Sequence, residues 1–106
     1  MEQLISPYIY PLLAIHKMNI DPDMIISQVA NAYGIDVQKL YKKSRLREIV
    51  EPRAVILYLL RKNGMTYMKT GNIFNLDHAT VIYHYKRVIE LLQVDKAFRK
   101  RTEGLI

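Results

Sequence analysis

The chain has 106 residues, 50% of them hydrophobic, which suits one compact domain with a single modest core. It has no cysteine, which excludes a disulfide framework, thiol chemistry and any zinc site built on cysteines. The net charge is +6, and it is unevenly distributed: residues 38–106 carry fifteen basic side chains against six acidic ones, whereas residues 1–37 carry one against four. This asymmetry predicts a polyanionic partner for the C-terminal two-thirds of the chain.

Residues 1–20 are predicted to form an extended N-terminal arm, separate from a helical domain at 21–106. Pro7 and Pro11 disfavour a helix there, yet the segment Tyr8–Leu13 is apolar, so we expect the arm to pack on the domain or on a partner. The arm lacks the positive start of a signal peptide, and no apolar run approaches the roughly 18 residues that a membrane span needs. A cytoplasmic protein is therefore expected. The basic residues are spread over several elements, which favours a partner other than a membrane surface.

Capping residues divide the first half of the domain into helices. A helix is predicted over 22–33, with Asp21 as its N-cap and Gly34 as its stop. A short helix capped by Asp36 follows, and its expected inward-facing residues are Val37, Leu40 and Tyr41. The basic loop 42–47 leads to a third helix over 52–62, predicted to open with Pro52. This helix is apolar almost all round, which is typical of the central buried helix of a bundle.

The second half predicts a helix-turn-helix and a terminal helix. Thr66 is the expected cap of a fourth helix ending near Phe74, and two residues separate it from Asp77, the N-cap of a helix over 77–92. That helix has an apolar stripe made of Val81, Ile82, Tyr85, Val88, Ile89 and Leu92. A second face carries Thr80, Tyr83, His84 and Arg87, with His78 and Ala79 at the tip, a layout typical of a helix that enters a DNA major groove. A last helix is predicted from Asp95. The fold class is all-α, a compact helical bundle with a helix-turn-helix in its C-terminal half.

The sequence contains no recognisable catalytic constellation. None of the four glycines begins a phosphate-binding loop pattern. His78 and His84 are six residues apart, about 240° around a helix, so they cannot hold a metal on one face. We expect no catalytic residue, no metal and no cofactor.

The basic loop is the other candidate DNA-binding element. Arg45 and Arg47 alternate with Ser44 and Leu46, so both arginine side chains point the same way if the loop is extended. An arginine from such a loop can enter a minor groove. Arg53 is expected at a helix start, where free backbone N–H groups and the guanidinium together suit an anion.

The order of these pieces resembles the C-terminal DNA-binding domain of the bacterial replication initiator DnaA. The resemblance covers about residues 22–99, and its most specific parts are the loop-to-helix junction Ser44–Arg53 and the helix start Asp77-His78-Ala79-Thr80-Val81. It implies the family's helical bundle, of the DnaA domain IV or Trp-repressor type. It also implies monomeric binding of double-stranded DNA, with residues 77–92 in the major groove and residues 44–47 at the minor groove. The candidate DNA contacts are Lys43, Arg45, Arg47, Arg53, Lys69, His78, Ala79, Thr80, Tyr83, His84 and Arg87.

Three departures from the family pattern bear on the function. Ala79 stands where the family commonly has a second threonine, so one hydroxyl is missing from the tip. Asn75-Leu76 replaces the usual Gly-Gly-Arg before Asp77, which shortens the turn and removes a cation. The ATP-hydrolysing domain of the initiator has no counterpart in these 106 residues, so we expect a stand-alone relative whose target sequence differs from the family's box.

The expected function is sequence-specific DNA binding in replication initiation or its regulation, with a replication protein as a further candidate partner. A helix-turn-helix transcriptional repressor is one alternative, which predicts a palindromic target and dimeric binding. A protein-interaction module that docks through Tyr8–Leu13 is another, and it predicts a basic face indifferent to DNA. An enzyme is disfavoured.

Overall fold

The computed structural model describes residues 21–106, and the predicted N-terminal arm lies outside this range. The described part contains only helices and their connections. The six helices are α2 (Pro22–Tyr33), α3 (Val37–Leu40), α4 (Arg47–Lys62), α5 (Tyr67–Ile73), α6 (His78–Val94) and α7 (Lys96–Arg101). The all-α prediction is confirmed, with the helix-turn-helix formed by α5 and α6.

Side-chain caps begin five of the helices, and four of these caps are predicted from the sequence; the fifth, Asp95, is predicted only as a helix start. In each case a side-chain oxygen accepts a backbone N–H of the first turn, over 2.8–3.1 Å. The five caps are Asp21, Asp36, Thr66, Asp77 and Asp95. Each interaction of this kind contributes about 1 kcal/mol to helix stability. The caps therefore fix where α6 and its neighbours begin.

Helix α4 is the exception, because it begins at Arg47 and not at Pro52. Its N-cap is Leu46, which makes no side-chain capping bond, and Pro52 lies inside the helix. Proline usually marks a helix start because it lacks an N–H. Here tertiary contacts stabilise the turn before it: Ile49 is 6% exposed and belongs to the buried side chains, and Glu51 bonds to Tyr33 and Arg101. The predicted start at Pro52 is therefore wrong by more than a turn.

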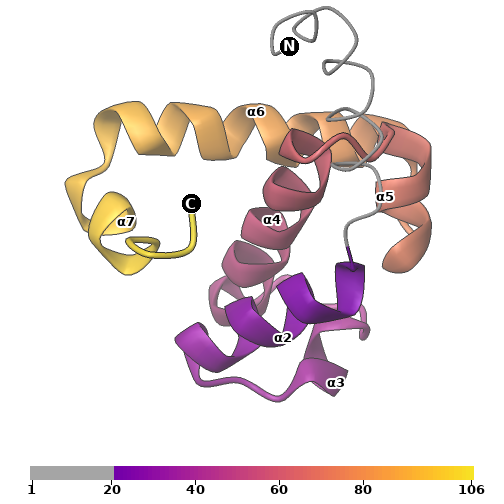
Figure 1. Ribbon diagram of the computed structural model, residues 1–106, viewed down its shortest axis with the longest axis horizontal. Helices are drawn as coiled ribbons and strands as arrows, with labels where there is room; N and C mark the ends of the chain where they lie inside the picture. Colours follow the sequence, from indigo (N-terminus) through magenta and orange to yellow (C-terminus); the bar gives the residue numbers. More distant parts are fainter. Residues whose placement is uncertain (1–20) are drawn as a thin grey trace, which may run out of the picture.

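The core forms around α4. Figure 1 shows α6 crossing one end of α4, with α5 and α7 beside the two ends of α6 and with α2 and α3 near the other end of α4. Val55, Ile56, Leu57 and Leu60 of α4 have no exposed surface, and Leu40, Val81 and Phe98 bring α3, α6 and α7 into the same cluster. Helix α4 packs against α2, α3, α5 and α6, and its Glu51 bonds to Arg101 of α7, so it fixes how α6 is presented.

Tyr41 departs from its predicted inward orientation. Its side chain is exposed at 43%, although its ring packs against that of buried Phe74 with 5.3 Å between centroids. Tyr41 is the C-cap of the four-residue helix α3, so the chain is already leaving the helix there. The tyrosine therefore covers Phe74 from outside the core.

Candidate nucleic-acid interface

The turn between α5 and α6 is held by close backbone contacts. The Leu76 N–H donates to the Gly71 carbonyl over 2.8 Å, and Asn75 adopts a left-handed conformation with φ 57°. A Cβ on Gly71 would lie 2.4 Å from the Leu76 carbonyl oxygen, so only glycine allows this approach. The two-residue turn predicted from Asn75 and Leu76 is thus confirmed, and it fixes the angle at which α6 leaves α5.

The N-terminal tip of α6 is open to solvent. The Asp77 carboxylate accepts the Thr80 N–H over 2.8 Å, and this hydrogen bonding to Thr80 lowers the pKa of Asp77, so the cap stays charged. His78 and Ala79 are exposed and Thr80 is half-buried. The first turn therefore presents side chains that the core does not require.

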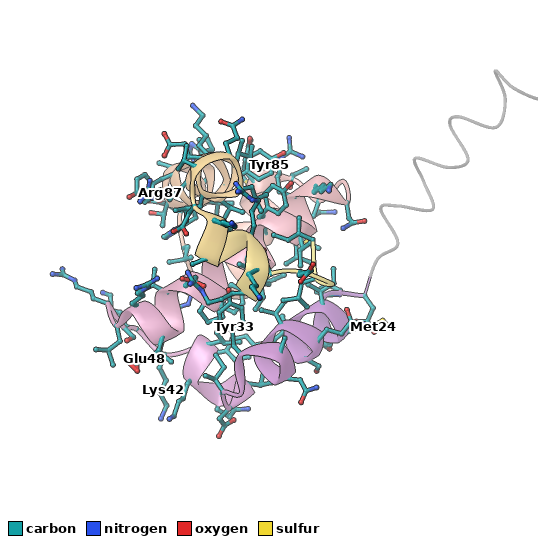
Figure 2. The ribbon with its side chains drawn as sticks, turned by 90° about the vertical axis from the view of Figure 1, so that its left-hand side faces the viewer. Met24, Tyr33, Lys42, Glu48, Tyr85 and Arg87 are labelled. Carbon is teal, nitrogen blue, oxygen red and sulfur yellow. The ribbon has the colours of Figure 1, made fainter. Side chains whose placement is uncertain are left out.

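The two sides of α6 differ as the sequence pattern predicts. Val81 and Val88 are buried, and Tyr85 stacks on Tyr58 with 5.3 Å between ring centroids. Tyr83 is 62% exposed and Arg87 lies on the same exposed side, away from Tyr85 (Figure 2). The face away from the core therefore combines an aromatic ring with a cation.

The basic segment 42–47 lies on the same side of the molecule as that face. Figure 2 shows Lys42 and Glu48 projecting on the side where Arg87 also lies. Residues 42–46 form the loop between α3 and α4, in which Lys43 and Arg45 are exposed, and Arg47 is the first residue of α4, with 77% of its side chain exposed. The cations of this segment are therefore accessible to a partner that also meets α6.

Two adjacent hollows join the loop to α6. The first, of about 390 Å³, lies between the loop, α4, α6 and α7, and we call it the α7 hollow. The second, of about 570 Å³, lies between the loop and the α5–α6 turn, and we call it the turn hollow. Arg45, Val50 and His84 line both. The hollows therefore adjoin at these three residues, and together we call them the groove.

The predicted site residues divide between this groove and the surrounding surface. Those that line it are Lys43, Arg45, Arg47, Arg53, Tyr83, His84 and Arg87. Lys69, His78, Ala79 and Thr80 lie outside both hollows, on α5 and at the tip of α6. Arg101 of α7 also lines the α7 hollow. The sequence alone did not indicate this, because Arg101 bonds to Glu51, fifty residues away.

Arg53 occupies a different place from the one expected. It lies in the second turn of α4 and is only 8% exposed, so no free N–H groups of a helix start surround it. Its Nε donates to the Leu40 carbonyl over 2.9 Å and its Nη2 donates to the Lys42 carbonyl over 2.6 Å. The expected anion site at a helix start is therefore wrong. The guanidinium instead fixes the beginning of the basic loop against α4.

His84 is half-buried beside this arginine. Burial and the nearby positive charge of Arg53 lower its pKa from the ordinary value, which favours the neutral imidazole. A neutral ring can donate through one nitrogen and accept through the other. The centre of the groove therefore carries a neutral polar group between cations.

Glu51 lines the α7 hollow and is contacted by three side chains. Arg101 donates to both its carboxylate oxygens over 2.9 Å, Tyr33 donates to one over 2.7 Å, and Arg47 lies 3.5 Å away. Burial alone would raise the pKa of Glu51, but the hydrogen bonds from Arg101 and Tyr33 and the nearby charges outweigh it and lower the pKa. Burial and the same hydrogen bond raise the pKa of Tyr33, which stays protonated.

The described residues 21–106 hold no helix long and apolar enough to cross a bilayer. Within the same range there is no group of three or more His, Cys, Asp or Glu side chains placed to hold a metal ion.

An all-helical domain with α5, a two-residue turn and α6, whose outer face borders a cationic loop, defines a helix-turn-helix protein. Residues 22–88 match the model of the bacterial DnaA protein helix-turn-helix. The chain belongs to this family.

Similar proteins include several named as chromosomal replication initiator proteins DnaA. The protein of Mycoplasma genitalium is 30% identical over 92 residues, which cover 86% of this chain and 21% of that protein. DnaA 1 of Chlamydia trachomatis is 33% identical over 85 residues, covering 79% and 19%. DnaA 2 of Protochlamydia amoebophila is 36% identical over 80 residues, covering 74% and 18%. The chain thus spans about a fifth of the length of these relatives, and helix α7 lies beyond the residues that the family model matches.

Proposed function

We propose that this protein binds a specific sequence of double-stranded DNA, with the tip of α6 in the major groove and Arg45 at the adjacent minor groove. The observation that carries the proposal is the shared lining of the two hollows: Arg45 of the loop and His84 of α6 line both. A major and a minor groove that adjoin on a duplex are separated by one sugar–phosphate strand. The groove between loop and helix offers that strand a cationic path.

The side chains fall into three proposed roles. His78 and Ala79, which are exposed, and Thr80, which is half-buried, lie at the tip of α6, where they would contact base edges or a thymine methyl. Lys43, Arg47, Lys69 and Arg87 would neutralise phosphates and thereby release counterions. Tyr83 and His84 are beside the strand path, and Arg53 acts by holding the loop that carries Arg45.

The names of the relatives favour replication as the setting. Since they are chromosomal replication initiators, we propose that this protein acts in replication initiation or its regulation, bound as one copy per site, with a replication protein as a further partner. A chromosomal target would place it in the cytoplasm.

Selection from a random duplex pool tests the proposal. The full chain is mixed with the pool at moderate salt, and bound duplexes are amplified and sequenced. We expect one short asymmetric motif to be enriched by the wild type and lost by a His78→Ala/Thr80→Ala variant that remains folded. Enrichment of no motif would exclude specific binding, and a palindromic motif bound by two copies would favour a repressor.

A further inference from the structure

The α7 hollow contains an acidic group where a DNA strand is proposed to lie. Four arginines from four segments line it, namely Arg45, Arg47, Arg87 and Arg101, together with Glu51 and Asp95. Asp95 caps α7 by accepting the Phe98 N–H over 3.0 Å. Glu51 has no such cap to form, and only 13% of its side chain is exposed, so solvent screens it weakly. Its charge must be compensated by protein groups.

Arg101 supplies most of that compensation. Its Nε and Nη2 donate to the two carboxylate oxygens of Glu51, each over 2.9 Å, in the bidentate geometry that gives strong carboxylate pairing. Tyr33 adds a hydrogen bond from α2 but no charge. Arg47 lies 3.5 Å from the same carboxylate and keeps 77% of its side chain exposed, so it is only loosely attached.

Loss of Arg101 would make Arg47 the main cation that pairs with Glu51. An uncompensated, weakly screened carboxylate attracts the nearest cation, and that cation is Arg47, at 3.5 Å. The same carboxylate would repel a phosphate in the hollow. Glu48 lies one turn from this site but is exposed, so water and salt screen its charge.

We propose that Arg101 is a positioning residue for DNA binding: by neutralising Glu51 it keeps the α7 hollow cationic and leaves Arg47, which is only loosely paired, able to contact a backbone phosphate. Helix α7 is outside residues 22–88 that the family model matches, so this contribution comes from outside the matched helix-turn-helix. The inference rests on the proposed function, because it assigns Arg101 a part in the same DNA complex.

A charge-rescue experiment separates this role from the alternatives. Binding of the full chain to its selected duplex is measured at several salt concentrations for the wild type, Arg101→Gln, Glu51→Gln and the double variant Glu51→Gln/Arg101→Gln. Thermal unfolding of each variant establishes the folded fraction. Lys62→Gln, alone and combined with Glu51→Gln, is the control, because Lys62 lies over the Tyr58 ring, which stacks on Tyr85 away from Arg87.

We expect Arg101→Gln to weaken binding and to reduce the salt slope by about one, the loss of one phosphate contact. The double variant should regain the wild-type slope and affinity, since neither an acid nor its partner remains. Lys62→Gln should leave the slope unchanged with or without Glu51→Gln.

Three results would overturn the inference in distinguishable ways. A double variant as weak as Arg101→Gln would mean that Arg101 itself contacts the phosphate. An unchanged slope in folded Arg101→Gln would mean that the pair serves stability alone. If the wild type bound no duplex at all, the proposed function would fail and this inference with it.

Discussion

The guanidinium of Arg53 joins the basic loop to the central helix, because its Nη2 donates to the Lys42 carbonyl over 2.6 Å while its Nε donates to the Leu40 carbonyl over 2.9 Å. These bonds hold the segment of the loop that leads to Arg45. Arg53 therefore uses these donors within the protein, and burial lowers its pKa without removing its charge. Its contribution to DNA binding is therefore expected to pass through the position of the loop.

Replacement of Arg53 should reduce stability as well as binding. Arg53→Gln loses two charge-assisted hydrogen bonds, to the carbonyls of Leu40 and Lys42, and bonds of this kind contribute about 1.5–3 kcal/mol each. We expect the urea midpoint to fall and amide hydrogen exchange in residues 41–46 to rise. Arg45→Gln, in the exposed part of the loop, should change the free energy of unfolding by less than about 0.5 kcal/mol. Equal stability of the two variants would contradict the anchoring role.

Glu51 and Glu90 offer a matched comparison of two ion pairs. Glu51 is paired with Arg101 and is 13% exposed, whereas Glu90 meets Arg87 over 3.2 Å with both side chains more than half exposed. Arg101 is itself 36% exposed, so Glu51→Ala should cost about 1–3 kcal/mol, mainly because it leaves the half-buried Tyr33 hydroxyl without its partner. Glu90→Ala should cost about 0–1 kcal/mol. Denaturant unfolding of both variants measures the difference, and similar losses would show that the Glu51 pair is solvated.

The helix caps follow from local sequence, whereas the start of α4 depends on distant contacts. Capping depends on a side chain and a backbone N–H two or three residues away, so the caps Thr66 and Asp77 could be predicted directly from the sequence. The start of α4 could not, because the turn before Pro52 is stabilised by contacts with Tyr33 and Arg101, 18 and 50 residues away in sequence from Glu51. Local rules fail where distant contacts stabilise the backbone.

The same distinction applies to the candidate site. The exposed faces of α6 and the cations of the loop follow from periodicity and composition, and both are located as expected. Whether a given arginine is free or already bonded depends on the fold: nothing in the sequence separates Arg47, with 77% of its side chain exposed, from Arg53, which is 8% exposed. A sequence shows which residues are charged, but it does not show which of these side chains are exposed to a partner.

Gly71 should be intolerant of any side chain. A Cβ there would lie 2.4 Å from the Leu76 carbonyl oxygen and 3.0 Å from Cγ2 of Val81, so Gly71→Ala must move the turn or tilt α6. Overpacking of this kind costs about 1–3 kcal/mol, and the tilt should also weaken DNA binding in the molecules that remain folded. Gly34→Ala is the control, since a Cβ meets nothing within 4 Å there and the only cost is a left-handed backbone at φ 66°. Wild-type binding by Gly71→Ala would show that the helix angle is not critical.

The pH dependence of stability should carry a contribution from His84. Burial and the charge of Arg53 lower its folded pKa below the value of about 6.5 that the unfolded chain has. Between the folded and unfolded pKa values the unfolded state binds more protons, so the free energy of unfolding rises with pH there and falls as pH drops below about 6.5. Arg45 lines the same two hollows as His84, and its positive charge also disfavours protonation of the imidazole. In urea unfolding from pH 5 to 8, His84→Gln should show a smaller fall than the wild type. Parallel curves would mean that His84 titrates alike in both states.

His78 and Arg47 should separate sequence discrimination from general affinity. His78 is exposed at the tip of α6, where a base contact is proposed, and loss of one such contact costs about 1–3 kcal/mol of discrimination. His78→Ala should therefore weaken binding to the selected duplex far more than binding to a scrambled one. Arg47→Gln removes a proposed phosphate contact, so it should weaken both duplexes alike and lower the salt slope by about one. If His78→Ala reduced both affinities equally, α6 would not be the element that reads sequence, because a helix tip lying on the backbone alone would respond to every duplex in the same way.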